Sequence, residues 1–368
     1  MMRIALLRNS PFGTLSGHDR ALLSFVDMLK AETATAVEAF SIGKNKKRAS
    51  SAGLGFYEHI VRGGLLAKRH LLAELSRFRP DVIVLFDRQL AGTVINYNRS
   101  AMPKAKVVVI TDSPEVVYNF SMKIDDSDMP EAVKKIVKAV YIMHARRLYI
   151  KTVEAATHVI LPTEEDMKRL IKEMPEAKDK CYVLQAVPTP TTKKARTVSN
   201  VSRVLFVGSY DYPPNKEAVG IIENSIAPKL PRIKFYIIGR GLPKKSHDNF
   251  FCLGELNNAD LEDWLKRADL CIAPLMHGTG LKTKVLDYAA YGKPIVGTSI
   301  AFQGFRARNG FNAIVEDNPE MFAKRIEELS NNKKLLRTLQ KNVRLLLNDF
   351  SREKVHRRFM ALYKSLSQ

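Results

Sequence analysis

Short apolar stretches alternate with longer amphipathic stretches along the whole chain. In its first half, apolar runs of strand length predict β-strands at residues 3–7, 82–86, 107–110, 158–161 and 182–184. Apolar positions recurring every three or four residues predict helices at 19–30, 65–78, 131–155 and 164–174. Strands that alternate with helices in this way are typical of a parallel sheet covered by helices.

A change in this pattern divides the chain into two domains. Residues 187–196 contain two prolines and no apolar period, which is typical of an exposed linker. Beyond it, strands are predicted at 203–207, 234–238, 250–253, 270–274, 294–298 and 313–315, and helices at 216–226, 258–266, 283–290, 319–330 and 333–350. With 368 residues the chain exceeds the size of a single core. We therefore predict an α/β protein of two Rossmann-like, doubly wound domains that face a central cleft, where such sheets place ligands.

Charge adds an expectation about partners. The chain has 59 Lys and Arg against 38 Asp and Glu, a net charge of +21, which favours an anionic partner such as a membrane, a nucleic acid or a phosphorylated substrate. Residues 1–196 carry 32 basic and 21 acidic residues, and residues 331–368 carry 10 and 2.

The three cysteines are far apart, which argues against a disulfide framework or a zinc site and favours a reducing compartment. No apolar run reaches the length of a membrane span, and the first is too short for a signal peptide.

The densest group of candidate ligand-binding residues follows the strand predicted at 270–274. A loop containing Gly278 and Gly280 leads into a helix that begins near Lys282. Glycines let a backbone approach a ligand closely, and the free amides at a helix start favour phosphate. Lys282 and Lys284 add positive charge for a diphosphate, and Asp287 can accept hydrogen bonds from ribose hydroxyls. An ordinary strand–loop–helix with a tight glycine turn is the alternative, but it accounts less well for two lysines and a carboxylate together.

Four segments in this half resemble one family. Residues 273–296 resemble the donor-binding segment of the retaining GT-B glycosyltransferases of family 4, in the subgroup with the pattern APL…GSGIKxKVLEAMAxGxPVV. Residues 205–215 resemble the LFVGxxDYxPN segment that opens the family's second domain, 237–241 its IVGxGP motif and 251–256 its base-binding strand and loop. The motifs occur in the family's order. The first domain is covered more loosely, by residues 15–18 and 109–113.

The resemblance implies a site for each substrate. Asp287 falls on the second Glu of the family's Glu-x7-Glu motif, which binds the donor ribose, and Thr279 falls on the first. Asp112, Thr279 and Asp287 are the catalytic candidates, and Gly17 and His18 are candidates for binding the acceptor. The implied donor-binding residues are Gly208, Ser209, Arg240, Glu255, Leu256, Gly278, Thr279, Gly280, Leu281, Lys282, Lys284 and Asp287.

The chain departs from the family at several of these positions. Thr279 cannot replace a carboxylate, and in this subgroup loop amides are expected to meet the sugar instead. Ser209 and Pro214 stand where many members have an Arg and a Lys that hold the diphosphate. That charge is left to Lys282, Lys284 and Arg240. Thr111 stands before Asp112 where many members have His.

The implied enzyme is a retaining glycosyltransferase of hexosyltransferase type. Its domains are an acceptor-binding domain at 1–190, a donor-binding domain at 197–350, and a C-terminal helix at 351–368 that packs back on the first domain. It would move a sugar from a nucleotide-diphosphate sugar, its co-substrate, to a lipid-linked or cell-surface glycan, with no cofactor and no metal. We expect it in the cytoplasm, attached peripherally to the anionic cytoplasmic face of a membrane, with no nucleic-acid partner. Basic and apolar residues interleave at 134–151, which suits a helix on anionic lipid as well as a partly buried helix.

Two other readings remain open at this point. A sugar-nucleotide epimerase or a phosphorylase on the same fold would share the donor site but need acid–base groups of its own. A non-enzymatic protein that binds anions or membranes would account for the net charge of +21.

Overall fold

The structure is a computed structural model that describes residues 2–8, 25, 27, 28, 31, 35–43, 47–50, 57–62, 67–85, 88–101, 104–125, 127–188 and 197–367. The chain forms two compact units. The first comprises residues 1–117, 129–187 and 352–368, and the second comprises residues 118–128 and 188–351. Most of the helix expected at 19–30 and of the linker expected at 187–196 lies outside the described residues.

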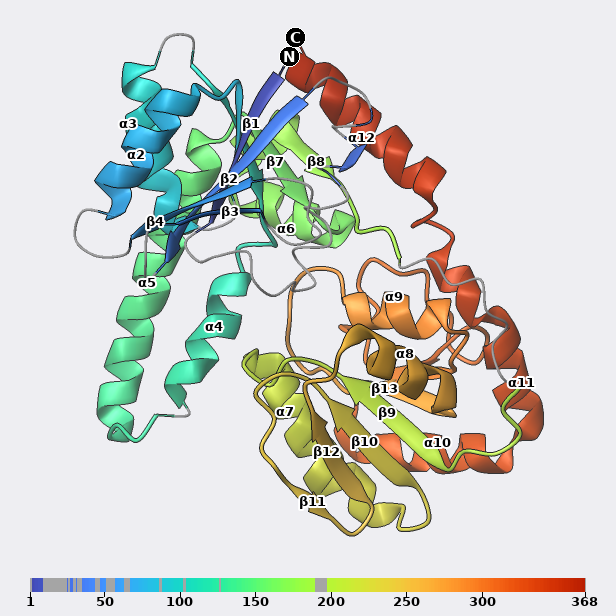
Figure 1. The fold of residues 1–368 in the computed structure, drawn as a ribbon. Helices are drawn as coiled ribbons and strands as arrows, with labels where there is room; N and C mark the ends of the chain where they lie inside the picture. The colour runs from blue at the N-terminus through green and yellow to red at the C-terminus, as the bar shows by residue number, and fades with distance from the viewer. Residues whose placement is uncertain are drawn as a thin grey trace. The chain divides into compact units, whose positions relative to one another are not determined.

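The first unit is built on an eight-stranded sheet with the order β3-β4-β2-β1-β5-β6-β7-β8 (Figure 1). All neighbours are parallel except β3 and β4. The strands are β1 (Met2–Arg8), β2 (Thr35–Gly43), β3 (Lys47–Ser50), β4 (Tyr57–Arg62), β5 (Val82–Leu85), β6 (Lys106–Ile110), β7 (His158–Leu161) and β8 (Cys181–Val183). The helices are α2 (Ala67–Phe78), α3 (Ala91–Ser100), α5 (Glu131–Ala155), α6 (Glu164–Glu173) and α12 (Arg352–Ser367).

Successive residues of the strands in this sheet point to two separate cores. In β6, Val107 and Val109 pack under α2, α3 and α5, whereas Val108 and Ile110 pack on the face that α12 covers. Because both faces are covered there, the central strands β5 and β6 are apolar over most of their length without alternation, as is usual for parallel sheets. Phe359 on α12 is fully buried there. The last helix of the chain therefore belongs to the first unit, although it follows the second unit in sequence.

The second unit has a seven-stranded sheet with the order β11-β12-β10-β9-β13-β14-β15, parallel except for β11. The strands are β9 (Arg203–Val207), β10 (Lys234–Ile238), β11 (Ser246–His247), β12 (Phe250–Gly254), β13 (Leu270–Ala273), β14 (Ile295–Gly297) and β15 (Ile314–Val315). The helices are α7 (Pro213–Ile221), α8 (Asn258–Arg267), α9 (Thr283–Ala290), α10 (Phe322–Asn331) and α11 (Lys333–Asn342). Helix α4 (Val116–Asp125) begins in the first unit and contributes residues 118–125 to the second.

Two helices of the second unit differ from the sequence expectation in their bounds. Helix α7 begins at Pro213, because proline suits the first turn of a helix, and it continues into a π-helical turn at Ile222–Ile226. The helix expected at 333–350 ends at Asn342 and is followed by a 3-10 helix at Val343–Leu347. Leu339 packs in the core on one face of the sheet and Val343 in the core on the other, so the apolar side of the segment changes where the winding changes.

Candidate functional site: the carboxyl edge of the second sheet

The predicted donor-site residues of the second unit follow the carboxyl ends of neighbouring parallel strands. Gly208 follows β9, Arg240 follows β10, Glu255 follows β12 and Thr279 lies in the loop after β13. Backbone hydrogen bonds tie these strand ends together, since Gly208 N donates to Ile238 O at 2.9 Å and Tyr210 N to Arg240 O at 2.8 Å. The structure thus brings segments about 70 residues apart in the chain to one edge of a single sheet.

Two glycines permit the close backbone approach at this edge. A Cβ atom at Gly239 would lie 1.9 Å from the carbonyl oxygen of Gly208. A Cβ atom at Gly208 would lie 2.8 Å from Cγ of Asn215. A larger residue at Gly239 would therefore push the end of β10 away from β9, and one at Gly208 would displace the Asn215 side chain.

Asn215 is a site residue that the sequence reading did not single out. It is buried in the first turns of α7, where its Nδ2 donates to the Ser209 carbonyl at 2.9 Å. Its Oδ1 accepts a hydrogen bond of 2.7 Å from Nζ of Lys284 on α9. The amide thus links the loop after β9 to α9. Its signals in the sequence were its place at the end of the 205–215 segment and directly after a Pro-Pro pair that opens a helix.

Lys284 is held in a desolvated position. Its Nζ lies 4.0 Å from the centre of the Phe206 ring as well as against Asn215. Desolvation, and then the nearby charge of Lys282, lower the pKa of Lys284 to about 7. The residue retains some exposed surface, but its amine sits among apolar and amide groups. It is therefore a group whose charge can change near neutral pH.

The amine of Lys282 contacts the carbonyls of the loop that precedes it. Its side chain is buried, and its Nζ donates to the carbonyl oxygens of Thr279 at 3.2 Å and Gly280 at 2.7 Å, with Gln303 Oε1 at 3.4 Å. The C=O and N–H groups of a trans peptide point in opposite directions, so this ammonium directs the Gly280 and Leu281 amides away from itself. Lys282 therefore holds the conformation of the loop through its carbonyl groups. The sequence analysis had expected its charge to act on a diphosphate.

The glycines of this loop have backbone conformations that other residues avoid. Gly278 has a φ of 134° and Gly280 a φ of 72°, both in the region that favours glycine. Thr279 between them is buried, and its hydroxyl lies 3.4 Å from Nδ2 of Asn119, which also lies 3.3 Å from the Tyr212 hydroxyl. Asn119 belongs to the α4 segment of the second unit and had no signal in the sequence that pointed to this loop.

The helix after the loop connects the site to the sheet. Tyr288 of α9 is fully buried and accepts a hydrogen bond of 2.8 Å from the backbone N–H of Val207 at the end of β9. Asp287, the preceding residue, lies half-buried on the same helix. The position of α9 and that of the β9 end are therefore set together.

The remaining donor-site candidates lie along the same edge. Arg240 is half-exposed and its Nε donates to Asp211 at 3.0 Å. Glu255 is exposed and Leu256 half-buried beside α8. Oγ of Ser209 is buried with no hydrogen-bond partner among the described residues.

The catalytic candidate Asp112 lies in the first unit. It is buried just after β6, and its backbone carbonyl accepts a hydrogen bond of 2.9 Å from the Tyr149 hydroxyl. The acceptor candidates Gly17 and His18 lie outside the described residues.

The described residues also bear on metals and membranes. They contain no group of three or more His, Cys, Asp or Glu side chains arranged to hold a metal ion. No helix in the described part of the chain is long and apolar enough to cross a membrane.

Comparisons with known proteins bear on the fold and on the second unit. Residues 201–332 match the family described as Glycosyl transferases group 1. An uncharacterized glycosyltransferase of Methanocaldococcus jannaschii is 26% identical over 174 residues, which cover 44% of this chain and 48% of that protein. The chain thus spans about half the length of this curated relative.

Solved structures resemble the chain over its full length. Sucrose-phosphate synthase from Thermosynechococcus elongatus has a TM-score of 0.75 at 13% identity, with 100% of this chain and 99% of that one covered. HepE from Anabaena, in complex with UDP and glucose, has a TM-score of 0.72 at 13% identity, with both chains fully covered. The fold of the chain is therefore that of the GT-B glycosyltransferases, with α/β units built on parallel sheets. Within this class, residues 201–332 of the chain form a glycosyl transferases group 1 domain.

Proposed function

We propose that the protein transfers a hexose from a nucleoside diphosphate sugar to a glycan acceptor, with retention of the anomeric configuration. The observation that carries this proposal is the loop from Gly278 to Gly280, whose carbonyls are held by Lys282 at the carboxyl edge of the sheet. The amides of Gly280 and Leu281 on its other side are donors for an anionic leaving group. Preorganised donors of this kind stabilise the charge that develops as a leaving group departs.

The remaining donor contacts follow from the same edge. Lys284 would pair with the diphosphate, Asp287 would accept hydrogen bonds from the ribose, and Glu255 and Leu256 would border the base. Ser209 and Arg240 lie where the phosphates would pass. That the HepE structure holds UDP makes uridine diphosphate the first ligand to test.

The reaction needs few groups beyond these. The bond between the sugar C1 and the diphosphate oxygen breaks, and C1 forms a bond with the acceptor oxygen. The acceptor's proton passes to the departing phosphate oxygen, so that no pair of carboxylates is required. In the second unit, Thr279 is proposed to border the donor sugar and Asp287 its ribose, and Asp112 is the catalytic candidate of the first unit.

The acceptor is proposed to be a lipid-linked or cell-surface glycan that the protein meets from the cytoplasm, attached peripherally to the membrane. The excess of basic residues supports this, at 32 against 21 acidic residues in residues 1–196 and 10 against 2 in residues 331–368. Helix α12 packs in the first unit, so most of this charge excess lies on that unit.

A panel of nucleoside diphosphates tests the donor site. A ligand present at one hundred times its Kd stabilises the folded state by about 2.7 kcal/mol, so the cognate diphosphate should raise the Tm by several degrees. The corresponding nucleoside should raise it far less. If no diphosphate in the panel stabilised the protein, or if nucleoside and diphosphate did so equally, the proposed donor site would be wrong.

Lys284→Met tests the diphosphate contact. Losing one charge-assisted hydrogen bond should cost about 1.5–3 kcal/mol of diphosphate affinity and leave nucleoside affinity nearly unchanged, as measured by calorimetry. Lys229→Met, which removes an exposed lysine of the same unit, is the control.

Retention of the anomeric configuration is tested by donor hydrolysis with water as acceptor, because proton NMR identifies the anomer released before it equilibrates.

A further inference from the structure

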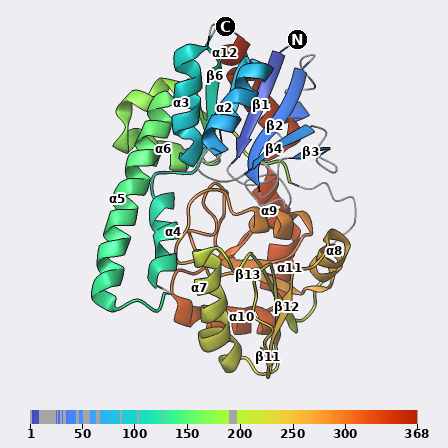
Figure 2. The same ribbon diagram turned by 60° about the vertical axis from the view of Figure 1, so that its left-hand side comes forward.

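The long helix α5 exposes an apolar surface at its amino-terminal half. Its last turns are anchored, with Tyr149, Thr152 and Val153 buried in the first unit. Figure 2 shows the other half extending beyond the sheet. The large apolar side chains exposed there are Val133, Ile136, Val137, Val140, Tyr141 and Met143, of which Ile136 is 65% and Met143 66% exposed. An apolar surface of this kind on one element indicates an interaction site.

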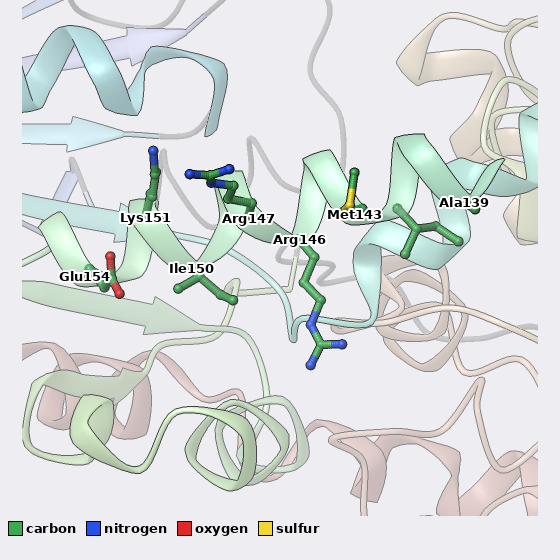
Figure 3. Close-up of a pocket in the computed structure, with 8 residues that line it drawn as sticks. Ala139, Met143, Arg146, Arg147, Ile150, Lys151 and Glu154 are labelled. Carbon is green, nitrogen blue, oxygen red and sulfur yellow. The ribbon is translucent and has the colours of Figure 1, made fainter. Parts of the chain in front are cut away.

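Four of these side chains share one stripe with two cationic residues. The stripe consists of Val133, Ile136, Val140, Met143, Arg147 and Lys151. The three- and four-residue intervals between them place them along one side of a helix. In Figure 3, Met143, Arg147 and Lys151 project from the same side of α5. The stripe is therefore apolar over its first half and positively charged over its second.

A shallow hollow accompanies the charged half of α5. It encloses about 700 Å³ and is lined by apolar Ala139, Ile142 and Ile150 together with Arg147, Lys151 and Glu154 (Figure 3). Arg146, at the same hollow, is paired with Glu173 at 2.7 Å. The helix as a whole has six basic residues against two acidic ones, Glu131 and Glu154.

We propose that α5 is the membrane-docking element of this protein, and that its stripe lies in the interface of an anionic phospholipid bilayer. Ile136, Val140 and Met143 would enter the acyl boundary, while Arg147 and Lys151 contact lipid phosphates. A helix with an apolar side and exposed Lys and Arg binds such interfaces through buried apolar area and attraction to anionic lipid. A protein partner would fit the apolar half, but the second half favours an occupant with many mobile negative charges.

This inference rests on the peripheral attachment proposed above and names the surface responsible for it. It does not involve the nucleotide site, because every residue of the stripe lies in the first unit. Nucleotide binding can therefore be measured separately in each variant.

Vesicle sedimentation of the full-length protein tests the proposal. The vesicles contain phosphatidylcholine alone or with about one third phosphatidylglycerol, at about 0.05 M and about 0.5 M salt. The parent protein should bind only the anionic vesicles and leave them at high salt. The double variant Arg147→Glu with Lys151→Glu should bind more than tenfold more weakly, since each neutralised cation is worth about fivefold. Ile136→Ser with Met143→Ser should also weaken binding severalfold without changing the charge.

A matched double variant controls for total charge. Lys229→Glu with Arg232→Glu makes the same charge change on exposed residues of the second unit and should bind vesicles nearly as the parent does. Binding lost equally in this control, or kept in both α5 variants, would overturn the assignment of α5 while leaving peripheral attachment intact. Binding to neutral vesicles as strong as to anionic ones, or no vesicle binding at low salt, would overturn both. Self-association abolished by Ile136→Ser with Met143→Ser, without vesicle binding, would instead make α5 an interface between copies.

Discussion

The protonation state of the Lys284 amine is the residue-scale property that bears most on ligand binding at the candidate site. In the folded protein its pKa is lowered to about 7, first by desolvation. It donates to Asn215, and the sequence placed it opposite a diphosphate. A buried amine that is partly neutral without ligand can gain its proton when an anion arrives.

The first consequence is a dependence of stability on pH. The unfolded chain keeps the lysine protonated up to about pH 10, whereas the folded chain releases this proton near pH 7. Between these values the unfolded state binds more protons, so the free energy of unfolding rises with pH. The Tm of the parent should therefore rise more from about pH 7 to about pH 9.5 than that of Lys284→Met. Parallel curves for the two proteins would contradict the lowered pKa.

The second consequence concerns proton uptake on ligand binding. If the diphosphate lies against Lys284, its negative charge raises the pKa of the amine, and binding at about pH 8.5 takes up a fraction of a proton. Calorimetry in two buffers of different ionisation enthalpy measures this uptake. It should vanish in Lys284→Met. Uptake that persists in the variant would assign the proton to another group.

At the scale of elements, the site depends on how closely the ends of β9 and β10 approach one another. The Gly208 N–H donates to Ile238, and no side chain separates Gly208 from Gly239. Helix α9 is tied to the same strand end through Tyr288 and Val207. The strand ends and the loop after β13 therefore act as one assembly, and a change at one joint should alter nucleotide binding at another.

A glycine pair tests this element-scale packing. Gly239→Ala places a methyl group 1.9 Å from a backbone oxygen and should destabilise the second unit by at least about 2 kcal/mol, with loss of nucleotide binding. Gly220→Ala, in helix α7, meets nothing closer than 4.0 Å and should stabilise by about 0.5–1 kcal/mol. Denaturant unfolding gives both values. Equal effects would show that the spacing of the strand ends does not matter.

At the scale of the whole molecule, the chain returns to its first unit after completing its second. Helix α12 buries Val355, Phe359, Leu362 and Leu366 against strands formed by the first part of the chain. Lys106 of β6 donates to the carbonyl of Leu366 at 2.9 Å. The stability of the first unit therefore depends on residues that follow the second unit in sequence.

Phe359→Ala tests this dependence. Removing a fully buried aromatic ring should cost about 3–5 kcal/mol. Hydrogen exchange should show lost protection in β1, β5 and β6 but not in β9, β10 and β13, because Phe359 is buried in a core that those first three strands form. Lys364→Ala, on the exposed side of the same helix, is the control and should leave both sheets protected. Protection lost equally in both units would show that they unfold together.

The sequence alone identified the elements whose signal is local. The strands expected at 203–207 and 234–238 and the helix expected at 131–155 agree with β9, β10 and α5 in their bounds. An apolar run or a helical period acts over a few residues, so it can be read without knowledge of the fold. Strands β2 and β4 were missed because they mix polar with apolar residues. Strand β4 lies next to the antiparallel edge strand β3.

The partners of the functional side chains were decided only by the tertiary structure. The sequence predicted that Lys282 and Lys284 lie at the start of a helix suited to phosphate, but not that Lys282 holds the loop carbonyls while Lys284 reaches Asn215, 69 positions away. The approach of Asn119 to Thr279 spans 160 positions. Burial and hydrogen bonding depend on which segments the sheets bring together, and they change both the pKa of an amine and its role. Residue type and spacing therefore indicated the class of the site, whereas packing between distant segments determined what each residue does there.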